Sequence, residues 1–229
     1  MENFDYIRKN YEELCSEIDL LAKKAGQEVT LVAVTKSGSD EELVALIEAG
    51  ASDMGENRPQ ELVRRGELLK EKGLTPRLHE IGNLQRNKVK SIIGSVALIH
   101  SVDGVELAEE IGKRASAIGR VVPILIEVNS AKEEAKGGIM PEAVEDFYLK
   151  IREIEGICVE GIMTMGPVTD DPEQIRPYFR LTKEIFDRLN EKYGFKNGGI
   201  LSMGMSDSYR VAIEEGSTLV RVGRRLFQK

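Results

Sequence analysis

A lysine closes the first apolar run of the chain, and its place there suits carbonyl chemistry. Residues 29–34 (VTLVAV) form a continuous apolar run with β-branched side chains, which is typical of a strand buried on both faces. Lys36 follows this run after one threonine. We expect its amine to be partly desolvated at the mouth of a sheet, because burial favours the neutral amine that condenses with an aldehyde to a Schiff base. The alternative is an exposed lysine that begins a loop with residues 37–39 (SGS).

Two glycine-containing segments near the C-terminal end have the features of a phosphate site. In residues 202–208 (SMGMSDS), Gly204 permits a tight turn, and the predicted helix that follows offers free N–H groups and a dipole that attract anions. In residues 218–223 (TLVRVG), Gly223 allows a close approach of backbone to an oxygen, and Arg221 can donate two parallel hydrogen bonds. A capped helix and a surface arginine are the alternative. Because both features occur together, the pattern favours phosphate binding.

A lysine amine and a phosphate site together predict a ligand class. A phosphorylated aldehyde would use both at once, and the common cofactor of that description is pyridoxal phosphate. Two further polar residues stand near predicted strand ends. Asn57 could bind a ligand or cap the helix that Pro59 helps to begin. His79 alternates with Glu80, so one of the two faces inward, and a single histidine is more often a packed, hydrogen-bonded core residue than a catalyst.

Strand and helix patterns alternate along the whole chain and position these residues. Strand patterns occupy residues 29–34, 53–55, 77–81, 96–101, 121–128, 157–163, 199–203 and 218–223. Helical patterns occupy residues 3–26, 41–49, 59–72, 87–93, 104–118, 141–154, 172–193 and 208–215. Asp40 is the expected cap of the second helix, which closes at Gly50.

This alternation predicts an α/β protein that is a single (β/α)8 TIM barrel with an extra N-terminal helix. We expect one domain over residues 1–229, with the lead-in helix in residues 1–26 and the barrel in residues 29–227. A doubly wound open sheet is the rival, because the alternation alone does not show closure. In a barrel, functional groups lie at the carboxyl ends of the strands, and the loops after the seventh and eighth strands are the common phosphate site.

Composition excludes several other functions. The 229 residues hold 32 lysines and arginines against 39 aspartates and glutamates, a net charge of −7, which argues against a nucleic-acid binder. Two cysteines cannot by themselves form a four-ligand zinc site or a disulfide framework, and a total of two histidines further weakens any metal site, so we expect no metal. The first residues are polar, and no run of about 18 apolar residues occurs. We therefore expect a reduced, cytoplasmic protein without a membrane segment.

At this point the sequence resembles a known family, the YggS/PROSC-type pyridoxal phosphate homeostasis proteins, which share the barrel of bacterial alanine racemase. The resemblance covers residues 29–227. It rests on the motifs AVTK at 33–36, GEN at 55–57 with QE at 60–61, HEIGNLQRNK at 79–88, VN at 128–129, Lys136 with GI at 138–139, GIM at 161–163, LSMGMSD at 201–207, GST at 216–218 and VRVG at 220–223.

The resemblance implies a monomeric barrel that holds pyridoxal 5'-phosphate as a Schiff base on Lys36. It assigns the phosphate contacts to Ser202, Met205, Ser206, Arg221 and Gly223. Arg221 matches the arginine that faces the pyridine nitrogen, and such a partner keeps that nitrogen unprotonated. Asn57 and His79 match positions that line the pocket, and Lys136 matches a lysine of a second, transient cofactor contact.

The chain departs from this family at two positions. Gly38 stands where the family often has a second lysine, and Arg224 stands where a threonine hydroxyl usually meets the phosphate. Arg224 could supply its charge or only its backbone N–H.

We expect a protein that takes up pyridoxal phosphate, masks its aldehyde and hands it over, with cofactor-dependent apo-enzymes as recipients. One alternative is an amino-acid racemase, which would need an acid/base opposite Lys36. Related racemases supply that group from a second domain, and we expect none in a chain that ends at Lys229, so racemase activity should be weak or absent. Another alternative is a barrel that binds a different phosphate ester.

Overall fold

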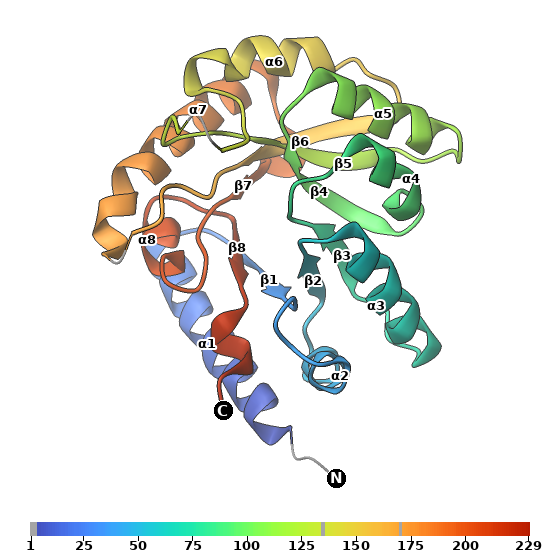
Figure 1. The fold of residues 1–229 in the computed structure, drawn as a ribbon. Helices are drawn as coiled ribbons and strands as arrows, with labels where there is room; N and C mark the ends of the chain where they lie inside the picture. Colours follow the sequence, from blue (N-terminus) through green and yellow to red (C-terminus); the bar gives the residue numbers. More distant parts are fainter. Residues whose placement is uncertain (1–3, 134–135, 170) are drawn as a thin grey trace.

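Eight parallel strands close into a barrel in the computed structural model, which describes residues 4–133, 136–169 and 171–229 (Figure 1). The strands are β1 (Thr30–Val34), β2 (Asp53–Glu56), β3 (Arg77–Glu80), β4 (Val96–Val102), β5 (Val122–Glu127), β6 (Ile157–Met163), β7 (Ile200–Ser202) and β8 (Leu219–Val222). Pairing of β1 with β8 closes the sheet, so the open-sheet rival is wrong and the barrel is confirmed. Each expected strand is present, with bounds that differ by at most one residue.

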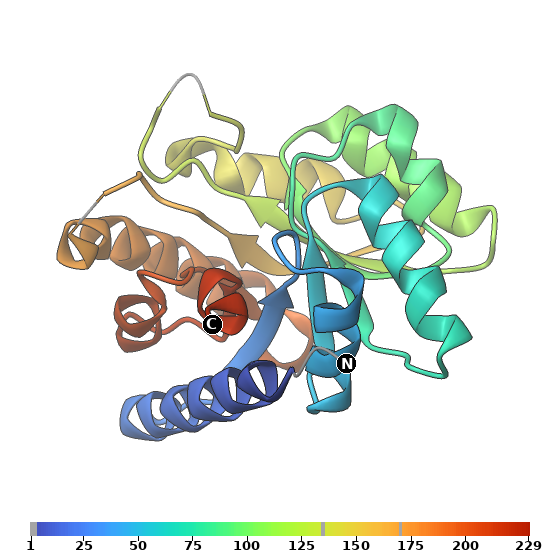
Figure 2. The ribbon, with the colours of Figure 1, turned by 60° about the horizontal axis from the view of Figure 1, so that its bottom comes forward.

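Helices surround the barrel on its outside (Figures 1 and 2). They are α1 (Asp5–Ala25), α2 (Asp40–Glu48), α3 (Pro59–Glu71), α4 (Val89–Ile92), α5 (Val105–Ser116), α6 (Val144–Ile151), α7 (Arg176–Tyr193) and α8 (Tyr209–Glu214). Short 3-10 turns are η1 (Arg86–Lys88), η2 (Pro141–Ala143), η3 (Pro172–Ile175), η4 (Lys196–Gly198) and η5 (Arg224–Phe227). Three of the expected helices therefore begin as 3-10 turns, before α4, α6 and α7. No helix among the described residues is long and apolar enough to cross a bilayer.

Helix α1 is the extra element expected at the N-terminal end, although residues 1–3 lie outside the described part of the chain. Its apolar positions recur at helical spacing, so one face is buried. Gly26 ends the helix at φ +69°, a left-handed conformation that glycine adopts readily, and its N–H reaches the last carbonyls of the helix. The buried face packs against α8, α2 and η5 (Figure 2).

The barrel interior is divided into an apolar and a polar part. An apolar cluster of Val32, Leu98, Leu125, Met163 and Leu219 fills one part. Side chains two positions apart on a strand share a face, so residues two positions further along several of these strands also face inward. These residues are polar and lie closer to the carboxyl ends of the strands; they are His100, Glu127 and Arg221. This polar part positions the site described next.

Candidate functional site

Lys36 lies in the turn after β1, at the carboxyl end of the barrel. It is exposed, so the expected partial burial of this lysine is wrong. Thr35 is still buried, and the chain leaves the barrel directly after it. Lys36 lines a pocket of about 380 Å³ together with Ser37, Glu56, Asn57, Arg58, Glu61 and Arg65. In the described part of the chain, no carboxylate forms an ion pair with its amine, which leaves that amine available to a ligand.

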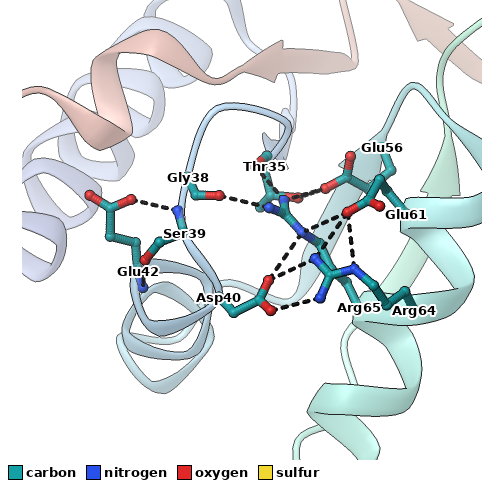
Figure 3. Close-up of polar contacts among 9 residues, drawn as sticks. All are labelled: Thr35, Gly38, Ser39, Asp40, Glu42, Glu56, Glu61, Arg64 and Arg65. Carbon is teal, nitrogen blue, oxygen red and sulfur yellow. Dashed lines mark hydrogen bonds and ion pairs between the residues drawn. The ribbon is translucent and has the colours of Figure 1, made fainter.

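A buried arginine fixes the backbone on both sides of Lys36 (Figure 3). Arg65 projects from α3 and donates from Nη1 to the carbonyl oxygen of Thr35 at 2.5 Å and from Nη2 to that of Gly38 at 2.7 Å. Nη1 also lies 2.7 Å from Oε1 of Glu56, which is 1% exposed. Thr35 Oγ1 donates to the same carboxylate oxygen at 2.5 Å. The turn that carries Lys36 is therefore held rigidly, while the lysine side chain stays exposed.

Helix α2 begins directly after this turn, and its cap differs from the expected one (Figure 3). Ser39, not Asp40, is the N-cap: its hydroxyl accepts from the N–H of Glu42, and the Glu42 carboxylate accepts from the N–H of Ser39. Asp40 is the first helical residue and binds Arg64 through both carboxylate oxygens, at 2.6 and 2.8 Å. These hydrogen bonds hold the pKa of Asp40 below its usual value.

Gly38 faces the C-terminal 3-10 turn, which accounts for the absence of a side chain at this position. A Cβ placed on Gly38 would lie 2.4 Å from the ring of Phe227 in η5. The family's second lysine therefore has no room here while Phe227 keeps its place.

The loops after β7 and β8 meet, as the phosphate-site hypothesis requires. The N–H of Gly223 donates to Oγ of Ser206 at 3.3 Å, and the N–H of Met205 donates to Oγ of Ser208 at 3.1 Å. Gly204 turns the first loop at φ +95°, where a Cβ would lie 2.5 Å from that of Ala212. Among the described residues, the N–H groups of Ser206 and Arg224 donate no hydrogen bond to another protein group, which leaves them available to an anion.

Gly223 also joins these loops to the start of the Lys36 turn. A Cβ on Gly223 would lie 2.8 Å from the carbonyl oxygen of Val34, the last residue of β1. Barrel closure therefore brings the start of the turn that carries Lys36 next to the loop after β8.

Arg221 lies inside the barrel, so the surface-arginine alternative is wrong. The side chain is buried, with Nη1 2.5 Å from Oγ of Ser202 and Nη2 3.1 Å from the carbonyl oxygen of Thr164. Burial lowers the pKa of Arg221 to about 10, against an opposing effect of Glu127. Arg221 therefore stays a cation at neutral pH and has to be matched by acceptors.

His79 is engaged within the protein on both ring nitrogens. Nε2 lies 2.8 Å from Oδ1 of Asp53, and Nδ1 lies 3.0 Å from Nε2 of His100. His100 in turn lies 3.0 Å from Oγ of Ser202 through its Nδ1. Sequence reasoning missed Asp53, His100 and Arg65. The alternation of β4 could have identified His100 as an inward residue, but no local signal connects Arg65 to the lysine turn.

The remaining predicted residues lie at different places around the mouth. Asn57 is exposed and lines the pocket with Lys36, while Arg58 occupies the N-cap of α3, so the capping alternative for Asn57 is wrong. Lys136 is in the loop after β5, where it pairs with Glu133 at 2.8 Å. The guanidinium of Arg224 forms an exposed ion pair with Asp207, which joins the loops after β7 and β8.

Comparison with known proteins gives consistent matches over nearly the whole chain. The model of the family described as alanine racemase, N-terminal domain, matches residues 10–228. A pyridoxal phosphate homeostasis protein of Aquifex aeolicus is 43% identical over 197 residues, which covers 86% of this chain and 85% of the relative.

Solved structures agree with this match. An unknown protein from Bifidobacterium adolescentis has a TM-score of 0.89 at 34% identity, covering 99% of this chain and 97% of that one. PipY of Synechococcus elongatus PCC7942, solved with pyridoxal phosphate bound, has a TM-score of 0.84 at 25% identity, covering 97% of this chain and all of that one.

Proposed function

The chain belongs to the alanine racemase N-terminal domain family, and from this premise we propose that it is a pyridoxal phosphate homeostasis protein that holds the cofactor on Lys36. The observation that carries the proposal is the close approach of Gly223 to the carbonyl oxygen of Val34, which brings the loop after β8 to the start of the turn that carries Lys36. Lys36 would hold the cofactor through its amine, and the cofactor would supply an aldehyde for a reversible condensation that releases water.

The phosphate would lie between the loops after β7 and β8. We assign its contacts to the backbone around Met205, Ser206 and Gly223. Gly223 has no side chain, which allows a close approach of the backbone at this position. The N–H of Arg224 would replace the family's threonine hydroxyl, because its guanidinium is paired with Asp207. Ser202 would act through Arg221, since its hydroxyl is bound to that guanidinium.

Arg221 would face the pyridine nitrogen of the cofactor. A guanidinium only donates hydrogen bonds, so it keeps its partner nitrogen unprotonated and weakens the ring as an electron sink. This suits a carrier or a racemase and disfavours a transaminase, which needs a carboxylate partner for that nitrogen. Asn57 would contact the cofactor from the pocket that Lys36 also lines. His79 would act on the site through its hydrogen bond with His100. Lys136 would make a second, transient contact with the cofactor.

A carrier accounts for this site better than a racemase does. Racemisation needs an acid/base opposite Lys36. Tyr209, the nearest tyrosine in sequence to the phosphate loop, is buried among residues of α1 and η5, and its hydroxyl is bound by Arg225. We propose a monomer that acts in the cytoplasm and hands the cofactor to apo-enzymes.

Borohydride reduction tests the proposal, because only an imine becomes a permanent lysine adduct. We expect purified protein with added pyridoxal phosphate to show a visible absorbance band that reduction abolishes, with the label on Lys36 in peptide mapping. Lys36→Ala should lose the label, whereas Lys9→Ala, at an exposed lysine of α1, should keep it. A protein that stays unlabelled would contradict the proposal and favour a barrel for another phosphate ester. Amino-acid turnover by the cofactor-loaded protein before reduction would favour the racemase.

A further inference from the structure

Five buried polar side chains form a continuous line across the barrel interior. They are Asp53 on β2, His79 on β3, His100 on β4, Ser202 on β7 and Arg221 on β8. The successive contacts are 2.8 Å, 3.0 Å, 3.0 Å and 2.5 Å from Asp53 to Arg221. The line ends at the residue that we propose to face the cofactor.

The chemistry of the two ends fixes the direction of every hydrogen bond. Arg221 can only donate, and an ionised carboxylate can only accept. Ser202 Oγ receives the N–H of Arg221, so its one hydrogen is free to go to Nδ1 of His100.

Nε2 of His100 then carries its hydrogen and donates to Nδ1 of His79, and Nε2 of His79 donates to Asp53. Each imidazole carries one hydrogen, and each hydrogen has one acceptor.

The reverse direction would place extra charge in the same space. His100 would have to donate to Ser202, which requires His79 to carry a second proton while Arg221 stays a cation. Burial is the largest effect that holds the pKa of His100 well below its ordinary value, and the charge of Arg221 adds to it, so a further cation is disfavoured here.

Separate observations support an ionised Asp53 at the carboxylate end of the line. Burial alone would raise the pKa of Asp53, but hydrogen bonds from His79 and Ser52 lower it. Arg77 adds a guanidinium 3.4 Å from Oδ1 of Asp53. The other carboxylate acting on the Arg221 end, Glu127 on β5, attracts the guanidinium.

We propose that this line is a hydrogen-bond relay of fixed direction, with both imidazoles as neutral Nε2–H tautomers, and that His79 and His100 are positioning residues which hold Arg221 for the cofactor. The positioning role rests on the proposed function, whereas the tautomers do not. Without His100, the Ser202 hydroxyl is free to rotate, and Arg221 loses an acceptor whose lone pairs are oriented toward it.

The first test needs no cofactor. The chain has two histidines, and both belong to the relay, so 15N-histidine NMR at neutral pH reads it without interference from others. We expect both residues to have unprotonated Nδ1 and protonated Nε2. Ser202→Ala should alter the Nδ1 signal of His100, and Ser130→Ala, at a buried serine bonded to Thr164 instead, should leave it unchanged. An Nδ1–H tautomer or an imidazolium in the unmodified protein would overturn the relay.

The second test measures retention of pyridoxal phosphate and the absorbance band of the bound cofactor. His100→Leu should weaken retention roughly tenfold, as expected for a lost hydrogen bond near a charged group, and should shift the band. His100→Asn keeps an acceptor near the Nδ1 position, so it should recover most of the retention. Equal retention and an unchanged band in His100→Leu would overturn the positioning role. If His100→Leu does not fold, cofactor retention and the absorbance band of His100→Asn and His79→Gln decide the positioning role instead.

The outcomes separate this inference from the proposed function. Failure of the unmodified protein to bind pyridoxal phosphate would refute the function and the positioning role together, and the NMR result would still decide the relay. Normal binding with wrong tautomers would refute the relay alone.

Discussion

The guanidinium of Arg65 lies 2.7 Å from the carbonyl oxygen of Gly38, two residues beyond Lys36. The same side chain reaches the carbonyl of Thr35, one residue before Lys36. One buried arginine therefore fixes the backbone on both sides of an exposed lysine. This arrangement reduces the conformational freedom of the backbone on both sides of Lys36 without burying its amine.

Removing Arg65 should destabilise the protein strongly. Arg65→Ala leaves the carboxylate of Glu56 buried without its ion-pair partner, and breaking a buried pair in this way costs about 3–5 kcal/mol. Urea unfolding measures the free energy. Arg64→Ala is the matched control, because the neighbouring Arg64 is about half exposed and should cost less than about 1 kcal/mol. Equal losses in the two variants would contradict the role of Arg65.

Adding one methyl group at Gly223 should weaken cofactor retention. A Cβ there would lie 2.8 Å from the carbonyl oxygen of Val34, so the end of β8 would have to move away from the Lys36 turn. Gly223→Ala should bind pyridoxal phosphate less tightly, as measured by equilibrium dialysis. Gly94→Ala is the control, since a Cβ on Gly94 meets open space. Unchanged affinity in Gly223→Ala would remove this glycine from the proposed phosphate site.

The cap of α2 should contribute a measurable part of the stability. Ser39→Ala removes the hydroxyl that binds the N–H of Glu42 and should lower the free energy of unfolding by about 1 kcal/mol. Thermal or urea unfolding measures the change. Ser37→Ala, in the exposed turn, should stay within about 0.5 kcal/mol. The capping assignment fails if Ser37 proves the more costly of the two.

Glu80 should make stability fall as the pH rises. Burial raises the pKa of Glu80 to about 8, from an ordinary value near 4.3 in an unfolded chain. Between these values the unfolded chain loses a proton that the folded one keeps, so each pH unit lowers stability by up to about 1.4 kcal/mol. Glu80→Gln removes this contribution.

Urea unfolding at a series of pH values from 5 to about 8 compares the two proteins. We expect the stability of Glu80→Gln relative to the unmodified protein to increase steadily over this interval. A constant difference would mean that the carboxyl ionises equally in both states, in disagreement with its complete burial.

Local sequence signals were enough to predict the order of the elements and the places of the loops that we propose to bind the ligand. Apolar runs and glycine turns are local signals, so the strands, the lysine after β1, the turn at Gly204 and the glycine after β8 could all be predicted from them. The resemblance to a family then identified the cofactor, because its motifs occur in order over most of the chain.

The contacts between polar side chains became apparent only from the folded chain. His79 contacts His100 across 21 positions of sequence, and His100 contacts Ser202 across 102, so no local pattern joins them. The same applies to Arg65, which reaches from α3 to the turn after β1. Closure of the barrel between β1 and β8 buries Arg221 and leaves Lys36 exposed, because the interior is formed only when all eight strands are in place.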